Sequence, residues 1–159
     1  MSKTVWACCA LILMATPALA QPVPPTPESS RFQPQDLFGL EVASDPQISP
    51  DGSRIAYVRQ TADIMTDRMR PTIWLIDTRS SQQTPLVATA GSHSQPRWSP
   101  DGTRVAYIST AEGGGAQLFV RWISSGQTVR VTSLPNAPAG ISWSPDGTKI
   151  AYSVLVAGQ

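Results

Sequence analysis

A pattern that occurs three times in the chain constrains its fold more than any other feature. The copies occupy residues 46–57, 96–107 and 140–152, and each contains Ser-Pro-Asp-Gly followed by a hydroxyl residue, a basic residue, a β-branched residue, Ala and Tyr. The copies are 50 and then 45 residues apart, counted from Asp51 to Asp101 and from Asp101 to Asp146. Self-similarity at this period indicates a chain built from stacked structural units.

Each copy predicts a reverse turn between two strands. Serine accepts a hydrogen bond at the first turn position, proline presets φ at the second, aspartate suits the third, and glycine takes the positive φ that follows. The residues assigned to these structural turns are Ser49, Pro50, Asp51 and Gly52, then Ser99, Pro100, Asp101 and Gly102, then Ser144, Pro145, Asp146 and Gly147. A bulky apolar residue precedes each turn. Trp98 and Trp143, with Ile48 as their counterpart, are predicted to be buried anchors beneath their own units.

The segments around and between the copies read as short strands. Apolar residues alternate after each turn, and two further strands are predicted in each interval, at 72–77 and 85–89 and then at 117–122 and 128–132. Four antiparallel strands in each period are typical of a β-propeller blade.

The predicted fold is therefore all-β. It is an incomplete β-propeller of about two and a half four-stranded antiparallel blades within residues 36–159. The first blade is expected at about 45–89, the second at about 96–133, and the start of a third at about 140–157. Since propellers typically close with about four to eight blades, the chain is expected to be a fragment or a truncated product.

The first 20 residues are predicted to be a secretory signal peptide. Lys3 supplies the positive charge, residues 5–15 form an apolar run, and Ala18 and Ala20 fit a cleavage site. The alternative is a membrane anchor, but a spanning helix needs about 20 apolar residues. Cleavage between Ala20 and Gln21 would remove both cysteines and deliver the protein to the periplasm or the exterior.

A proline-rich linker is expected at residues 21–35, because its composition favours an extended chain and cannot build a core. The next residues, 36–40, predict a short helical turn whose apolar Leu37, Phe38 and Leu40 would dock on the blades.

Composition excludes several classes of function. Twelve Lys and Arg residues against eleven Asp and Glu residues leave a net charge of +1, which provides no electrostatic footprint for nucleic acid or an anionic membrane. The 15 prolines and 11 glycines argue against a helical bundle, because both residues support helices poorly.

The sequence contains no catalytic machinery that we can identify. A Gly-x-Ser-x-Gly nucleophile elbow is missing, and the single histidine, His93, is expected to be solvent-exposed in a polar loop between blades. No cluster of His, Cys and carboxylate residues predicts a metal site, and no cofactor is expected. The aspartates of the three turns should lie on separate blades, so they do not form an acid–base pair.

Residues 98–107, Trp-Ser-Pro-Asp-Gly-Thr-Arg-Val-Ala-Tyr, resemble the WD-like repeat of exported bacterial propellers. Two groups use this repeat: the Tol-system periplasmic propeller protein, and the N-terminal propeller of the prolyl oligopeptidase family of serine peptidases. Residues 37–52 resemble the entry into the first blade of dipeptidyl- and acylaminoacyl-type peptidases. The polar loop at 65–70 before the Ile-Trp-Leu strand is also similar to their first blade, and the resemblance covers about 36–157.

The resemblance implies a non-catalytic role for this chain. In the complete peptidases, a propeller sits over the active site of an α/β-hydrolase domain and restricts entry to peptides. The chain would then scaffold and gate a catalytic domain, with a peptide as substrate only if a C-terminal catalytic domain exists. The alternatives are a Tol-like propeller that binds protein partners, and a product without function. Whether the chain is part of an enzyme stays open.

The signal-peptide hypothesis has a direct test. We expect the exported protein to begin at Gln21, because the small residues Ala18 and Ala20 fit the signal peptidase site. N-terminal sequencing of protein recovered outside the cytoplasm measures this, and a mature chain that still begins at Met1 would contradict it.

Overall fold

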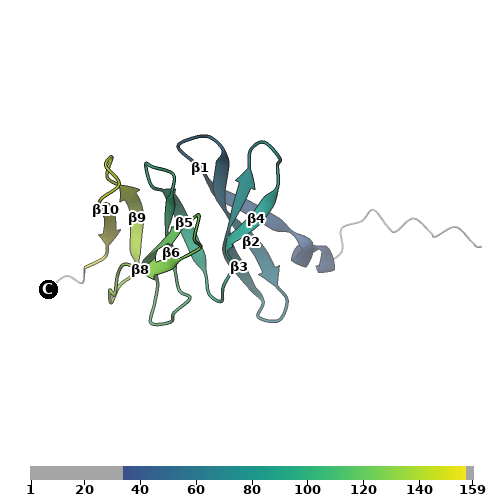
Figure 1. Ribbon diagram of the computed structural model, residues 1–159. Helices are drawn as coiled ribbons and strands as arrows, with labels where there is room; N and C mark the ends of the chain where they lie inside the picture. Colours follow the sequence, from purple (N-terminus) through teal and green to yellow (C-terminus); the bar gives the residue numbers. More distant parts are fainter. Residues whose placement is uncertain (1–33, 157–159) are drawn as a thin grey trace, which may run out of the picture. The chain divides into compact units, whose positions relative to one another are not determined.

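The computed structural model of the protein describes residues 34–156, in which nearly all regular structure is β-strand (Figure 1). The predicted signal peptide and residues 21–33 of the predicted linker lie outside the described residues. The described elements are the 3-10 helix η1 (Pro34–Gly39) and the strands β1 (Glu41–Ile48), β2 (Arg54–Asp63), β3 (Arg68–Asp77), β4 (Gln83–Val87), β5 (His93–Trp98), β6 (Arg104–Ser109), β7 (Gln117–Trp122), β8 (Thr128–Arg130), β9 (Pro138–Trp143) and β10 (Ile150–Val154).

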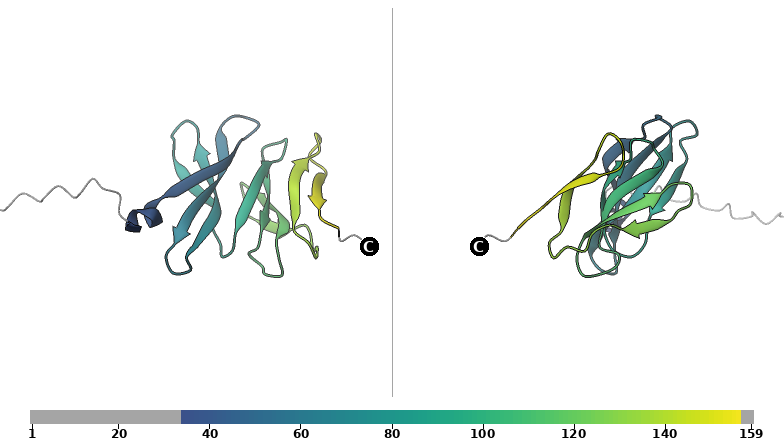
Figure 2. Two further views of the ribbon diagram at one scale, coloured as in Figure 1. Left: turned by 180° about the vertical axis from the view of Figure 1, so that it is seen from behind. Right: turned by 60° about the vertical axis from the view of Figure 1, so that its left-hand side comes forward.

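The strands form three antiparallel sheets that follow one another in chain order (Figures 1 and 2). Blade 1 is the sheet β1-β2-β3-β4, blade 2 is the sheet β5-β6-β7-β8, and blade 3 is the pair β9-β10. The all-β fold with four-stranded antiparallel sheets that the sequence predicted is confirmed.

Several element boundaries differ from those expected. Strand β1 begins at Glu41, before the expected start of blade 1 at residue 45. The loop expected at 65–70 is shorter, because β2 and β3 stay paired out to Asp63 and Arg68. Residues 64–70 are all exposed, so the polar and charged side chains there are compatible with a strand in solvent. The helical turn at η1 forms and contacts β2, although Leu37 and Leu40 remain about half exposed and Phe38 about one-third exposed.

The apolar core lies between the blades. One cluster joins blades 1 and 2, and its buried members are Ile73, Leu86, Val87, Val105, Tyr107 and Phe119. A second cluster joins blades 2 and 3, and its buried members are Ala106, Ile108, Leu118, Val120 and Ile141. Successive residues of β6 therefore enter opposite clusters, which is what the two-residue period of a strand requires. Burial of each large aliphatic or aromatic side chain contributes roughly 1.5–3 kcal/mol.

The two tryptophans that precede the turns link neighbouring blades. The Trp98 indole N–H donates to the carbonyl of Gln47 at 3.0 Å, and the Trp143 indole N–H donates to the carbonyl of Arg97 at 3.0 Å. Both side chains are half-buried at blade junctions, so the prediction that each packs beneath its own blade is wrong.

Ile48 is also not the buried anchor that was expected, because its side chain is 68% exposed. Its counterparts Trp98 and Trp143 are partly covered by the preceding blade, whereas no blade precedes β1 among the described residues.

His93 is the largest departure from the sequence expectation. It is the first residue of β5 and is completely buried, although its polar neighbours predicted an exposed loop. Its ring lies edge-on to Tyr107, with centroids 6.2 Å apart, and its Nε2 lies 3.1 Å from the carbonyl oxygen of Thr89. Desolvation lowers the pKa of His93 below its usual value, so burial favours the neutral ring.

The indole hydrogen bonds can be tested separately from aromatic packing. We expect Trp98→Phe and Trp143→Phe each to lower the free energy of unfolding by about 1 kcal/mol, since each leaves a carbonyl without its donor. Trp122→Phe is the matched control, because no hydrogen bond of its indole is recorded in the described part of the chain. Urea midpoints of the full chain measure the effect. Equal losses in all three variants would show that the indole N–H contributes nothing at the blade junctions.

Candidate functional site

The three Ser-Pro-Asp-Gly turns share one hydrogen-bonded arrangement. In the second turn, the Ser99 hydroxyl donates to Asp101 Oδ1 at 2.5 Å and accepts the backbone N–H of Arg104 at 3.0 Å. The Gly102 N–H donates to the Ser99 carbonyl at 2.9 Å, and Gly102 has a φ of 68°. The first and third turns repeat these bonds at Ser49, Asp51, Gly52 and Arg54 and at Ser144, Asp146, Gly147 and Lys149.

These bonds fix the charge of the three turn aspartates. Hydrogen bonds from Ser49 and Ser53 lower the pKa of Asp51 to about 2, and those from Ser99 and Thr103 do the same for Asp101. Asp146 follows the same pattern in the third turn, where its pKa is also about 2. A carboxylate that already accepts several local hydrogen bonds and stays ionised is poorly suited to general acid–base catalysis at neutral pH.

Each turn belongs to a different blade, and neighbouring turns touch. Arg104 Nη2 donates to the Gly147 carbonyl at 3.2 Å, and its guanidinium lies 5.0 Å from the centre of the Trp143 ring. The turns therefore stabilise the blades and the junctions between them. We find no group of three or more His, Cys, Asp or Glu residues within 34–156 that could hold a metal ion.

A second set of polar groups lies on the first strand of each blade. Strand β1 contacts β5, and β5 contacts β9, so these three strands form one wall, which we call the inner wall. The pairing register shifts in each blade at this strand or its partner, as at a β-bulge. The bulge residues Asp45, Gln95 and Gly140 have positive φ values of 49°, 54° and 62°.

The bulges link one blade to the next. Arg97 on β5 donates through Nη1 to both carboxylate oxygens of Asp45 on β1, at 2.9 Å each. One blade further on, Gln95 Oε1 accepts the backbone N–H of Gly140 at 2.9 Å. A left-handed backbone costs about 1–3 kcal/mol at a residue other than glycine, and these bonds hold Asp45 and Gln95 in that conformation.

Sequence reasoning missed the inner-wall residues. One signal was present, because Asp45 and Gln95 occupy the same place relative to the turn and aspartate adopts positive φ more readily than most residues. The proline that follows each of them favours an extended conformation instead, so the observed φ could not be predicted. The partner of Asp45 lies on the next blade, so no local pattern could have identified Arg97.

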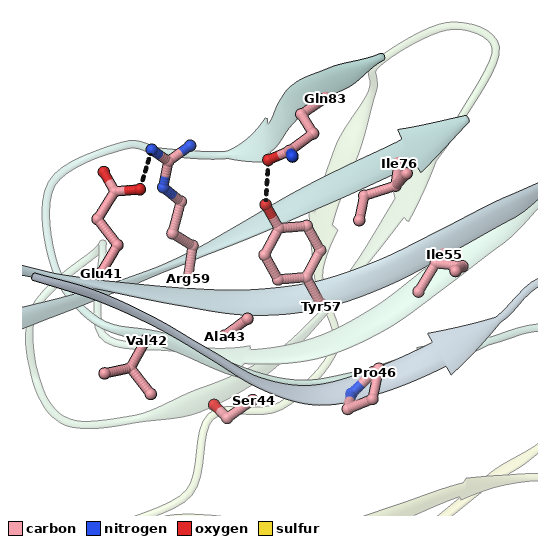
Figure 3. Close-up of a pocket in the computed structure, with 10 residues that line it drawn as sticks. All are labelled: Glu41, Val42, Ala43, Ser44, Pro46, Ile55, Tyr57, Arg59, Ile76 and Gln83. Atoms are coloured by element: carbon pink, nitrogen blue, oxygen red, sulfur yellow. Dashed lines mark hydrogen bonds and ion pairs between the residues drawn. The ribbon is translucent and has the colours of Figure 1, made fainter. Parts of the chain in front are cut away.

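A pocket of about 380 Å³ opens on blade 1 (Figure 3). Its lining consists of Glu41, Val42, Ala43, Ser44, Pro46, Ile55, Tyr57, Arg59, Ile76 and Gln83. Two polar pairs occupy it: Arg59 with Glu41, and the Tyr57 hydroxyl, which donates to Gln83 Oε1 at 2.8 Å. These polar groups bond one another within blade 1.

The position of the pocket in the repeat explains its apolar floor. Ile55 and Tyr57 correspond to Val105 and Tyr107 one repeat later, and the later pair packs into the junction between blades 1 and 2. The pocket is therefore lined by residues of the kind that pack between two blades one repeat later. The inner wall is the better candidate for a functional site.

The turn carboxylates predict a pH-dependent stability. The pKa of Asp101 is lowered to about 2 in the folded chain. The stability that its ionised carboxylate provides is therefore present above pH 4 and is lost as the pH falls toward 2. We expect Asp101→Asn to have a lower free energy of unfolding than wild type at pH 6. This difference should become smaller as the pH falls from about 4 to about 2. Thr78→Ala is the control, because it removes an uncharged donor to the neighbouring Gly52 carbonyl. Urea midpoints across this pH range measure the stability of both variants relative to wild type. A difference between Asp101→Asn and wild type that does not change with pH would contradict the lowered pKa of Asp101.

Comparison with known proteins agrees with the repeat and the fold. The model of the family described as the TolB beta propeller domain matches residues 39–159. A protein of Bacillus subtilis (strain 168) named uncharacterized peptidase YuxL is 34% identical over 100 residues, which are 63% of this chain and 15% of that protein.

Solved structures of low sequence identity show the same fold. Acylaminoacyl peptidase from Pyrococcus horikoshii superposes with a TM-score of 0.61 at 22% identity, covering 72% of this chain and 17% of the peptidase. The β-propeller domain of the Trilobed protease from Pyrococcus furiosus gives a TM-score of 0.59 at 20% identity, over 70% of this chain and 33% of that one. A TolB-type protein from Agrobacterium tumefaciens gives 0.59 at 21% identity, over 72% and 39%.

The expected resemblance to peptidase and Tol-type propellers is therefore confirmed at the level of domain family and fold. The chain spans only 15% of the Bacillus relative and 17% of the acylaminoacyl peptidase, so the match concerns one region of those proteins. Since the family model extends over most of the sequence, this chain belongs to the TolB β-propeller domain family.

Proposed function

We propose that this chain forms propeller blades of an exported serine peptidase of the prolyl oligopeptidase family. In this proposal the blades hold no catalytic residue. They scaffold a catalytic domain and restrict the peptides that reach it.

The observation that carries the proposal is the match to peptidase YuxL. Its 34% identity extends over 100 residues, well beyond the short turn motif that any propeller of this repeat type would share. The likeness to acylaminoacyl peptidase supports the same domain arrangement at the level of fold.

The inner wall fits a gating role. Blades of a closed propeller surround a central channel, and β1, β5 and β9 are the first strands of successive blades, with β5 in contact with both of the others. Each is the terminal strand of its sheet, so one of its edges is not paired within that sheet. An extended peptide could form backbone hydrogen bonds along such an edge.

Export is the second part of the proposal. It is supported by the signal-peptide pattern of residues 1–20 and by the TolB-type relatives. None of the helical turns in the described part of the chain has the length and apolar character needed to cross a bilayer.

The alternative is a TolB-like propeller that binds protein partners in the periplasm. The family match and the likeness to the Agrobacterium protein favour it, because both are described by the name TolB. Both functions use the same blades. They differ in whether the native polypeptide that contains these blades also carries a reactive serine.

A serine-directed probe separates the two functions. An antibody against the exposed hairpin tip at residues 64–70 would capture the native polypeptide from its host, and a fluorophosphonate probe would then label any activated serine. We expect the captured polypeptide to be labelled. Capture in the presence of excess hairpin peptide is the control.

The 159-residue chain by itself should remain unlabelled and should turn over Ala-Pro chromogenic substrates only at background, because it lacks a nucleophile elbow. Labelling of this isolated chain would contradict the non-catalytic role. A captured native polypeptide without label, recovered with stable protein partners, would contradict the peptidase proposal and favour the binding module.

A further inference from the structure

Arg97 is the cationic side chain of the inner wall. It is the only Lys or Arg residue in the described strands β1, β5 and β9. Its side chain is 29% exposed, so it is partly accessible to solvent although the backbone lies within a strand.

The hydrogen bonds of Arg97 use one corner of its guanidinium. Nη1 donates to Asp45 Oδ1 and Oδ2 at 2.9 Å each and to the carbonyl of Pro96 at 2.7 Å. For Nε and Nη2 no acceptor is recorded among residues 34–156, and neither atom is among the buried polar atoms that lack a partner. A guanidinium carries five N–H donors, so the edge formed by Nε and Nη2 has no partner among the described residues and is not fully buried.

The surroundings hold Arg97 in place before any ligand arrives. The Arg97 carbonyl accepts the Trp143 indole N–H at 3.0 Å, which fixes the backbone from the blade 3 side. Asp45 is fixed from the blade 1 side, where the Gln47 amide donates to its carboxylate at 2.9 Å. Ordering a binding group in advance reduces the entropy that a ligand must overcome. A strained φ at Asp45 is also a feature that concentrates at ligand sites.

We propose that the free Nε–Nη2 edge of Arg97 binds the carboxylate of a peptide that lies along the inner wall. Two parallel N–H···O bonds to one carboxylate match the geometry of this edge. Asp45 offsets part of the arginine charge, so a singly charged carboxylate suits the site better than a more highly charged anion. A C-terminal carboxylate and an acidic side chain share this chemistry. The inference rests on the proposed peptide-gating function and names the feature of the peptide that the wall would recognise.

The test is a titration of the ¹⁵N-labelled full chain, followed by NMR, in a buffer free of carboxylates and phosphate. The three probes are acetyl-trialanine with a free carboxylate, acetyl-trialanine amide, and acetyl-Ala-Glu-Ala amide. We expect a saturable shift of the Arg97 Nε–H and Trp143 indole resonances with the carboxylate peptides and none with trialanine amide. The two carboxylate probes distinguish a chain end from an acidic side chain.

Two variants make the test specific for the guanidinium edge. Arg97→Lys keeps a positive charge that can still pair with Asp45, but it removes the planar pair of donors, so the dissociation constant should rise on the order of tenfold. Asp45→Asn removes a competing negative charge, so carboxylate binding should tighten roughly two- to fivefold. Arg79→Lys, on an exposed turn, is the matched control and should leave the affinity unchanged.

The inference is overturned if the acid and amide peptides shift the same resonances with equal affinity. That comparison uses the wild-type chain, so it decides the matter even if a variant does not fold. The titration measures binding to the blades alone, so a negative result does not change the conclusion drawn from the serine probe. Carboxylate binding without a labelled serine would overturn only the peptidase proposal.

Discussion

The rest of this structure depends on a sheet that is apolar on both faces. Strand β6 sends Val105 and Tyr107 into one cluster and Ala106 and Ile108 into the other, and all four are nearly inaccessible to solvent. Such a sheet cannot be stable in water by itself, because each uncovered face would expose several large apolar side chains. Blade 2 therefore requires a neighbour on each side, and the indole hydrogen bonds of the two junction tryptophans fix how each neighbour is seated.

The sequence identifies local structure well because the turn chemistry is local. Serine, proline, aspartate and glycine form the same bonds three times within a few residues, so strands on either side of each turn can be placed without knowledge of the neighbouring blade. The contacts that the sequence did not reveal are those between blades. Ile48 and Trp98 occupy the same place in the repeat, yet one is exposed and the other half-buried, because within residues 34–156 a blade precedes Trp98 but none precedes Ile48.

His93 and Arg97 show the same limit at the candidate site. His93 stands among polar residues and reads as part of a loop, but the crossover from β4 to β5 brings its ring against Tyr107 and the carbonyl of Thr89. Arg97 was not singled out in the sequence, because its ion pair with Asp45 spans 52 positions of the chain. Neither role leaves a periodic trace, because each depends on a contact made once rather than at every repeat.

The structure separates stabilising groups from groups that remain free to bind. At the turns, each aspartate carboxylate is hydrogen-bonded within its own loop, and the resulting low pKa keeps the charge constant across ordinary conditions. On the inner wall, the bonds instead run between blades and leave part of a guanidinium without a partner. A propeller that restricts access to peptides needs both kinds of group, because its walls must be rigid while some of their polar atoms are still available. The junction between Asp45 and Arg97 has both kinds of group, since Nη1 of the arginine links two blades and its Nε–Nη2 edge has no partner among the described residues.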